Sequence, residues 1–310
     1  MPEPKVSRPR KVFSRGERAP VVVGIGEILW DMLPSGKQLG GAPANFAFHA
    51  RSLGARSAIV SAVGRDALGR EILGALEAAG LETRFISLVD AHPTGTVGVE
   101  LDIEGVPRFT IADGAAWDFI PSNANLLGLA VAADAVCFGT LAQRSPVSRA
   151  MIRAFLEATR PECLRVFDVN LRQSSHSREL LDDFLRKSSV LKVNEEELGV
   201  LTRLFSLSGS DTQVLTRLLE AYPLELIALT LGKRGSRLFS LKGESYCPAP
   251  AVEVSDTIGA GDAYMAALVM GLLKGKSLVE INDRANRVAA FVCTQPGAWP
   301  RIPASLSAWD

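Results

Sequence analysis

Residues 256–273 read DTIGAGDAYMAALVMGLL, a run of small residues that leads into an apolar segment. Helical spacing places four side chains of that segment on one face: Met265, Leu268, Val269 and Leu272. Small residues directly before a helix let free backbone N–H groups surround an anion, with the positive end of the helix dipole behind them. Asp262 then lies in the first turn beside that anion, with a carboxylate free to take a proton. For Asp262 alone, a plain helix cap after a glycine turn is the alternative.

A second turn of small residues stands at 40–45, which read GGAPAN. Its glycines precede a helix that begins near Pro43, and they allow the backbone to approach a ligand closely. Asp31 lies upstream on an extended segment. Asp31 and Asn45 could grip vicinal hydroxyls, because a carboxylate accepts twice and an amide both donates and accepts.

The remaining polar clusters each follow a short apolar run. They are Asp168-x-Asn170-x-Arg172, Asn194-Glu195-Glu196-Glu197 and residues 230–235, which read TLGKRG. Taken singly, each fits a turn or a helix cap. Together they lie at the carboxyl ends of predicted strands, where open parallel sheets bind ligands, and we therefore expect one site at that edge.

The order of predicted elements is typical of an α/β fold with a mostly parallel sheet flanked by helices. Strands are predicted at 21–23, 58–63, 164–169, 190–193 and 226–231, and helices at 43–53, 66–79 and 145–159. Short apolar strands between helices indicate right-handed βαβ units. Two extended segments, 28–39 and 94–111, turn at Pro34-Ser35-Gly36 and Glu104-Gly105. They form either ordinary edge hairpins or one small sheet over the carboxyl edge of the main sheet.

The composition excludes several classes of protein. The 310 residues carry 34 Lys and Arg against 34 Asp and Glu, a balance that argues against binding of nucleic acid through its phosphates. Four cysteines stand far apart without a CxxC pair, which indicates a reducing compartment rather than zinc or disulfides. No signal peptide or membrane span is expected, and the protein is predicted to be cytoplasmic. Residues 1–20 are basic and proline-rich and are predicted to be a disordered leader, with a nucleic-acid arm as the alternative.

Other catalytic motifs are incomplete or absent. Gly24-Ile25-Gly26 follows a strand, but position 29 is Leu, and the dinucleotide fingerprint therefore fails. Residues 271–277, GLLKGKS, are one residue short of a P-loop and are interpreted as the end of a helix. The chain has three histidines and neither HExxH nor GxSxG, which leaves acyl transfer through a serine–histidine pair without support.

From about Val21 to Pro303 the chain resembles the PfkB carbohydrate kinases, which have the ribokinase-like fold. The resemblance rests on LGGAPANFAFHARSLG from Leu39, FDVNLR from Phe167, KVNEEE from Lys192, TLGKRGS from Thr230 and, most specifically, DTIGAGDAY from Asp256. GEILWDMLP followed by LGGAPANFAFHA is most similar to the fructokinase-like branch. The resemblance implies a central sheet with a small β lid and ATP-dependent phosphorylation of a sugar hydroxyl.

The resemblance also implies roles for particular residues. Asp262 would be the catalytic base, with Gly259, Ala260 and Gly261 as the anion hole, and Asp31, Gly41 and Asn45 would bind the sugar. Asn194 and Glu197 match the NxxE element that supports Mg²⁺ through water. Thr230, Gly232 and Gly235 would border the nucleotide, with Asn286 near the adenine. Asp256, Ile258 and the turn near Gly297 match where a monovalent cation such as K⁺ binds in relatives, and Arg172 would contact phosphate or the lid.

Two departures from the family pattern are mild: Tyr264 stands where Phe is frequent, and Ile258 where Thr is frequent. We expect a fructose or similar ketose substrate and a homodimer formed through the lids. A nucleoside or 2-keto-3-deoxygluconate kinase is the alternative within the same chemistry, although residues 109–113 lack the Tyr-Tyr-Arg run of the keto-acid branch. A non-catalytic sugar or nucleotide sensor is the alternative from another class, and intact Asp262, Gly259 and Gly261 argue against it.

Overall fold

The computed structural model describes residues 18–33, 36–101, 107–172 and 176–309. Residues 1–17 of the expected leader and the turn positions 34–35 and 104–105 lie outside these residues. Pro20, which was assigned to the leader, is buried, and its carbonyl accepts a hydrogen bond from the backbone N–H of Arg56 at 2.9 Å. Pro20 therefore belongs to the fold, and the predicted boundary of the leader at residue 20 is placed slightly too late.

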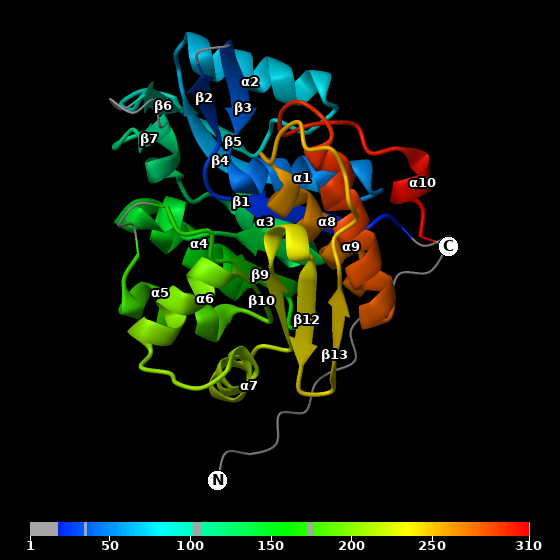
Figure 1. Ribbon diagram of the computed structural model, residues 1–310. Helices are drawn as coiled ribbons and strands as arrows, with labels where there is room; N and C mark the ends of the chain where they lie inside the picture. Colours follow the sequence, from blue (N-terminus) through cyan, green and yellow to red (C-terminus); the bar gives the residue numbers. More distant parts are fainter. Residues whose placement is uncertain (1–17, 34–35, 102–106, 173–175, 310) are drawn as a thin grey trace.

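The described strands form a central sheet of mostly parallel strands, as predicted (Figure 1). Its order is β13-β12-β11-β10-β9-β8-β1-β4-β5, and only the pairs β11–β12 and β12–β13 are antiparallel. The strands are β1 (Val21–Ile25), β4 (Arg56–Gly64), β5 (Ile86–Val89), β8 (Ala135–Phe138), β9 (Leu164–Asp168), β10 (Val190–Asn194), β11 (Leu226–Thr230), β12 (Ser236–Ser240) and β13 (Gly243–Cys247). β1 lies between β8 and β4, so the chain crosses to opposite sides of β1, and a ligand crevice is expected at that switch point.

Helices cover both faces of this sheet (Figure 1). One layer holds α1 (Ala42–Ser52), α2 (Ala67–Ala78), α8 (Ala260–Leu273) and α9 (Leu278–Cys293), and the short α10 (Ala304–Ser307) packs beside α9. The other layer holds α3 (Ala124–Ala132), α4 (Pro146–Ala158), α5 (Arg178–Lys187), α6 (Glu195–Leu204) and α7 (Asp211–Ala221). Within β1, Val21, Val23 and Ile25 face the second layer and Val22 the first, the alternation expected of a strand buried on both sides.

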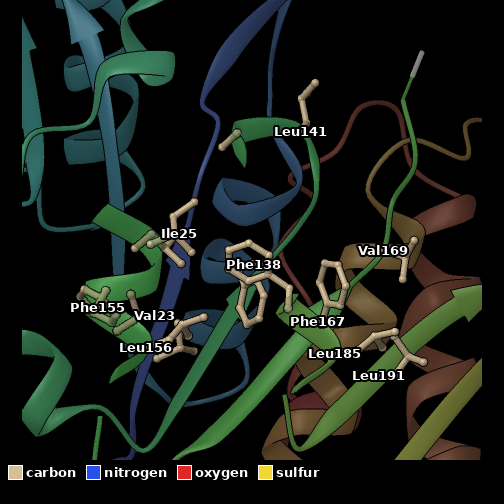
Figure 2. Close-up of a cluster of buried hydrophobic side chains, with 14 of the residues drawn as sticks. Val23, Ile25, Phe138, Leu141, Phe155, Leu156, Phe167, Val169, Leu185 and Leu191 are labelled. Atoms are coloured by element: carbon tan, nitrogen blue, oxygen red, sulfur yellow. The ribbon is translucent and has the colours of Figure 1, made fainter. Parts of the chain in front are cut away.

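Aromatic rings fill the core beneath the switch point (Figure 2). The rings of Phe138 on β8 and Phe167 on β9 stack with centroids 5.2 Å apart, and Phe184 of α5 lies against both. All three side chains are almost fully buried. The ends of β8 and β9 are therefore held rigidly, which fixes the loops that follow them.

A second sheet is formed by the two segments that were predicted to be extended. Its order is β3-β2-β6-β7, with β2 (Leu29–Leu33), β3 (Gly36–Gly40), β6 (Gly95–Leu101) and β7 (Pro107–Ile111). The pairing of β2 with β6 confirms the small-sheet alternative over two separate hairpins. The indole N–H of Trp30 donates to the carbonyl of Leu68 at 3.1 Å, which anchors this sheet to α2.

Helix ends agree closely with the predictions. Residues 271–277 are indeed a helix end, because α8 stops at Leu273 and Gly275 turns the chain with a φ of 64° before α9.

Within the described residues, no helix is both long and apolar enough to cross a membrane.

Candidate active site

A cavity of about 570 Å³ opens at the carboxyl ends of the central strands, next to the small sheet. It is lined by residues that follow β1 and β8, by the ends of β9 and β10, and by the start of α8. Its predicted members are Asp31, Gly41, Asn45, Arg172, Asn194, Glu197, Gly259, Gly261 and Asp262. The structure thus brings together side chains that are up to 231 positions apart, between Asp31 and Asp262.

Asp262 is the third residue of α8 and does not act as its cap. The capping position is Gly259, and the Oδ2 atom of Asp262 instead accepts a hydrogen bond of 2.8 Å from the Nδ2 atom of Asn45. The carboxylate lines the cavity, and the plain-cap alternative for this residue is therefore excluded.

The pKa of Asp262 is raised to about 7, mainly by burial and in the same direction by the nearby carboxylate of Asp168. The hydrogen bond from Asn45 and the positive charges of Lys192 and Arg172 act against this rise. A carboxylate with a pKa near neutrality is well matched to accept a proton at physiological pH.

The start of α8 provides a place for an anion. Gly259 has a φ of 75°, and a Cβ atom there would lie 2.9 Å from the carbonyl oxygen of Ala298, so this turn requires glycine. Among the described residues no side chain caps the helix, and Gly259 and Gly261 both line the cavity. The positive end of the α8 dipole therefore faces the space beside Asp262, and this arrangement fits a phosphate group.

Asp31 and Gly41 also line the cavity. Asp31 lies on β2 of the small sheet, and partial burial raises the pKa of its carboxylate while the charge of Arg172 opposes that rise. Gly41 has a φ of 108°, and a Cβ atom there would lie 2.5 Å from the carbonyl oxygen of Glu27. Glycine is therefore required at this turn by the close approach of the backbone that follows β1, and the predicted approach to a ligand stays a prediction.

Asn194 and Glu197 form a reciprocal cap at the start of α6. The Oδ1 atom of Asn194 accepts from the N–H of Glu197, and the Oε2 atom of Glu197 accepts from the N–H of Asn194, each at 2.8 Å. The Oε1 atom of Glu197 accepts from the N–H of Leu171 at 3.1 Å. The carboxylate is thereby fixed at the cavity, and an oxygen donor of this kind suits Mg²⁺ held through water.

Asp256 braces the loop in front of α8. Its Oδ1 atom accepts from the N–H of Ile258 at 3.0 Å, and its Oδ2 atom accepts from the N–H of Gly297 at 3.2 Å. The three positions matched to a monovalent cation are therefore neighbours, and a carboxylate among backbone groups suits such an ion. Among the residues that the structure describes, no group of three or more His, Cys, Asp or Glu side chains is arranged to hold a metal.

Several predicted residues lie outside the cavity lining: Asp256, Ala260, Thr230, Gly232, Gly235 and Asn286. Thr230 ends β11, and Gly232 begins the short turn that follows, with open space where a side chain would stand. Asn286 is buried on α9, where its Nδ2 atom donates to the hydroxyl of Ser236 at 2.7 Å and to the carbonyl of Asn282 at 2.8 Å. Its amide nitrogen is thus already engaged within the fold.

Two charged residues of the cavity were missed from the sequence. Lys192, in the apolar run of β10, pairs with Asp168 at 2.9 Å. Burial alone would lower the pKa of Lys192, but the carboxylates of Asp168, Glu197 and Asp262 raise it overall. Glu27 follows β1 and is 3% exposed, and its Oε2 atom has no hydrogen-bond partner among the described residues. Burial raises the pKa of Glu27. For both Lys192 and Glu27, the sequence signal was a charged residue inside or shortly after an apolar strand.

The chain is similar to known carbohydrate kinases in sequence and in fold. A family profile described as pfkB family carbohydrate kinase matches residues 35–304. A fructokinase of Klebsiella pneumoniae is 33% identical over 262 residues, which cover 80% of this chain and 83% of that protein. The crystal structure of an uncharacterised sugar kinase from Pyrococcus horikoshii in complex with ATP is 30% identical, with a TM-score of 0.76 and coverage of 90% and 94% of the two chains. That of fructokinase from Vibrio cholerae with fructose, ADP and calcium bound is 26% identical, with a TM-score of 0.78 and coverage of 93% and 97%.

Proposed function

Because this chain belongs to the pfkB family of carbohydrate kinases and is an ATP-dependent sugar kinase, we propose that its acceptor is fructose or a similar ketose. The observation that carries the proposal is the cavity that Asp31, Asn45 and Asp262 line together with Gly259 and Gly261 at the start of α8. Relatives named fructokinase, from bacteria and plants, support the choice of sugar.

In the proposed reaction Asp31 and Asn45 hold the sugar so that one hydroxyl lies beside Asp262. Asp262 takes the proton of that hydroxyl as the new phosphorus–oxygen bond forms, and the bond from the phosphorus to ADP breaks. Gly259, Ala260 and Gly261 would present backbone N–H groups to the transferred phosphoryl group, where negative charge is spread over its oxygens. In the structure the N–H of Ala260 donates to the carbonyl of Thr257 at 3.3 Å, and Gly259 and Gly261 are the two of the three that line the cavity. Arg172 and Lys192 add positive charge to the same cavity.

The remaining predicted residues are assigned to ATP and ions. Asn194, Thr230 and Gly232 would border the nucleotide, with Gly235 fixing their turn against β13 and Asn286 beneath the adenine side. Glu197 would hold Mg²⁺ through water, and Asp256 would shape a K⁺ site with the backbone near Ile258 and Gly297. When bound, Mg²⁺ neutralises charge on the phosphates.

The small sheet is proposed to be a lid that closes over the sugar and excludes water, because water in the site would hydrolyse ATP. Leu29, Asp31 and Leu33 from β2 line the cavity beside Val97 and Ile111 from β6 and β7. β3 and β7 are the edges of this sheet, and an edge strand can pair with another chain. We therefore propose a homodimer through the lids, for which a molar mass of one chain by light scattering would be the contrary result.

ATP consumption measured across a panel of sugars tests the proposed function. The panel contains fructose, ribose, a nucleoside and 2-keto-3-deoxygluconate, with Asp262→Asn as the control for contaminating kinases. We expect the highest kcat/KM with fructose or another ketose. A higher value with the nucleoside or the keto acid would move the assignment to the alternative acceptor. Sugar binding without ATP consumption on any member would instead identify a sensor.

A further inference from the structure

The loop after α9 contacts the face of α1 that carries Asn45. The Nε2 atom of His49 lies 2.9 Å from the carbonyl oxygen of Ala298, and burial lowers the pKa of His49 to about 4, so the neutral ring donates its N–H to that carbonyl. The ring of Phe48 stacks on the indole of Trp299 with centroids 4.6 Å apart and an interplanar angle of 13°. Two neighbouring residues of α1 therefore hold Trp299 in place independently of Asn45.

The indole N–H of Trp299 points at the amide of Asn45. Its Nε1 atom donates a hydrogen bond of 2.7 Å to the Oδ1 atom of Asn45. An indole nitrogen can only donate, and its partner in Asn45 must be the oxygen. The amide nitrogen then necessarily faces the other way, toward Asp262, to which it donates at 2.8 Å.

We propose that Trp299 is a positioning residue for the kinase reaction: its N–H orients Asn45 so that the amide presents its nitrogen to Asp262 and to the substrate hydroxyl. The proposal rests on the proposed role of Asp262 as the base. The sequence predicts that the Asn45 amide both donates to and accepts from sugar hydroxyls. In the structure its oxygen accepts the hydrogen bond from Trp299, and its nitrogen is the atom that contacts Asp262.

The orientation has a consequence for the charge of Asp262. A hydrogen bond donated to a carboxylate favours its ionised form. Other groups act on Asp262 from the elements around it: Asp168 on β9, Lys192 on β10, Cys137 on β8 and Arg172 in the loop after β9. Glu27, after β1, lines the same cavity. A change at Trp299 alters none of these groups directly and reaches Asp262 through Asn45.

The variant Trp299→Phe tests the proposal because it keeps a ring for Phe48 and removes the N–H. We expect kcat/KM for the sugar to fall about 3- to 10-fold, the effect of one neutral hydrogen bond. We also expect the acidic limb of the profile of kcat/KM against pH to move to higher pH, since the pKa of the base rises when its donor is lost. Trp299→His, which keeps a ring with an N–H, should have a limb closer to that of the wild type.

Trp309→Phe is the matched control. It makes the same chemical change on an indole whose nitrogen has no hydrogen-bond partner among the described residues and whose ring lies by Arg284 on α9. Its acidic limb should coincide with that of the wild type. Thermal unfolding of every variant establishes that the proteins compared are folded.

A double-mutant cycle with Asn45→Ala separates positioning from packing. If Trp299 acts through Asn45, Trp299→Phe has no further effect on the acidic limb once Asn45 is alanine. An unshifted limb in Trp299→Phe, or a shift that persists in the Asn45→Ala background, overturns the proposal. Failure of the proposed function looks different, because Asp262→Asn would then keep its turnover.

Discussion

With Asp262 as the proposed base, the pKa of its carboxyl, about 7, predicts that activity depends on pH near neutrality. The proposed base works only when ionised, and kcat/KM should therefore fall as pH drops through about 7. Asp168→Asn removes a negative charge that raises the pKa of Asp262. It also leaves the positive charge of Lys192 without its paired carboxylate, and both changes lower the pKa of Asp262. We expect the acidic limb to move to lower pH in that variant. A limb at the same pH in both enzymes would contradict this electrostatic account.

The proposed role of Asp31 in binding the sugar is tested by removing its carboxylate. Asp31→Ala should raise the KM for the sugar about 10- to 150-fold for each charge-assisted hydrogen bond that is lost, and leave the KM for ATP nearly unchanged. Asp90→Ala is the control, because Asp90 lies 76% exposed in a surface ion pair with Arg65. Steady-state kinetics with each substrate varied in turn provide both constants. Equal increases in the two KM values would indicate a structural role for Asp31.

Residues in local motifs were predictable, and residues defined only by long-range packing were not. Asp262 and Asn45 stand in glycine-containing turns at helix starts, where the local pattern already indicates a ligand. Glu27 and Lys192 have only the weaker signal of a charge in or after an apolar strand, and their position in the cavity depends on the alignment of β1 and β10 with β9. The contact of Trp299 with Asn45 joins residues 254 positions apart, and no motif near Trp299 in the sequence indicates this contact.

At the scale of an element, the start of α6 carries the proposed magnesium function. Glu197→Gln keeps the length of the side chain but removes the charge, and we expect about 10- to 100-fold weaker activation by Mg²⁺ together with lower turnover. Glu196→Gln is the control on the same first turn, because Glu196 is exposed and does not line the cavity. Rates are measured across a magnesium titration at saturating sugar and ATP. Identical titrations for Glu197→Gln and the wild type would show that the assignment is wrong.

The helix α8 shows where a periodic pattern misleads. The sequence predicts one apolar face, but residues Ala263–Gly271 are buried around the whole circumference. The reason is its position between the central sheet, α1 and α9, so that every direction meets protein. A helix at such a core position is apolar on all sides, and the alanines among residues 260–267 make the remaining faces of α8 apolar.

At the scale of the whole molecule, the aromatic core supports the edge that carries the site. Phe167→Ala removes a ring packed between Phe138 and Phe184 and should lower the free energy of unfolding by about 3–5 kcal/mol. Leu127→Ala on α3 is the control, because that side chain is 42% exposed and should change stability by less than about 0.5 kcal/mol. Urea unfolding provides both values. Similar stability losses in the two variants would contradict the described core.

Five strands of the main sheet, β1, β4, β9, β10 and β11, were predictable because each contains a short apolar run next to helices, whereas β5, β8, β12 and β13 were not predicted. The arrangement of the small sheet was not predictable, since two hairpins and one joined sheet require the same local pattern. The choice depends on the parallel pairing of Asp31 with Val97, residues from separate segments, and on the anchoring of Trp30 to α2. Long-range pairing of this kind leaves no trace in residue periodicity.

Turnover of Asp262→Asn tests the central claim most directly. Asparagine keeps the size of the side chain and cannot accept the proton, and we expect kcat to fall by about 10²–10⁴-fold, the usual contribution of a general base. Calorimetry should still show binding of ATP and sugar, and the unfolding temperature should stay at or above that of the wild type, because the buried carboxylate is costly to ionise. A variant that keeps more than about a tenth of the wild-type kcat would contradict the assignment of Asp262 as the base.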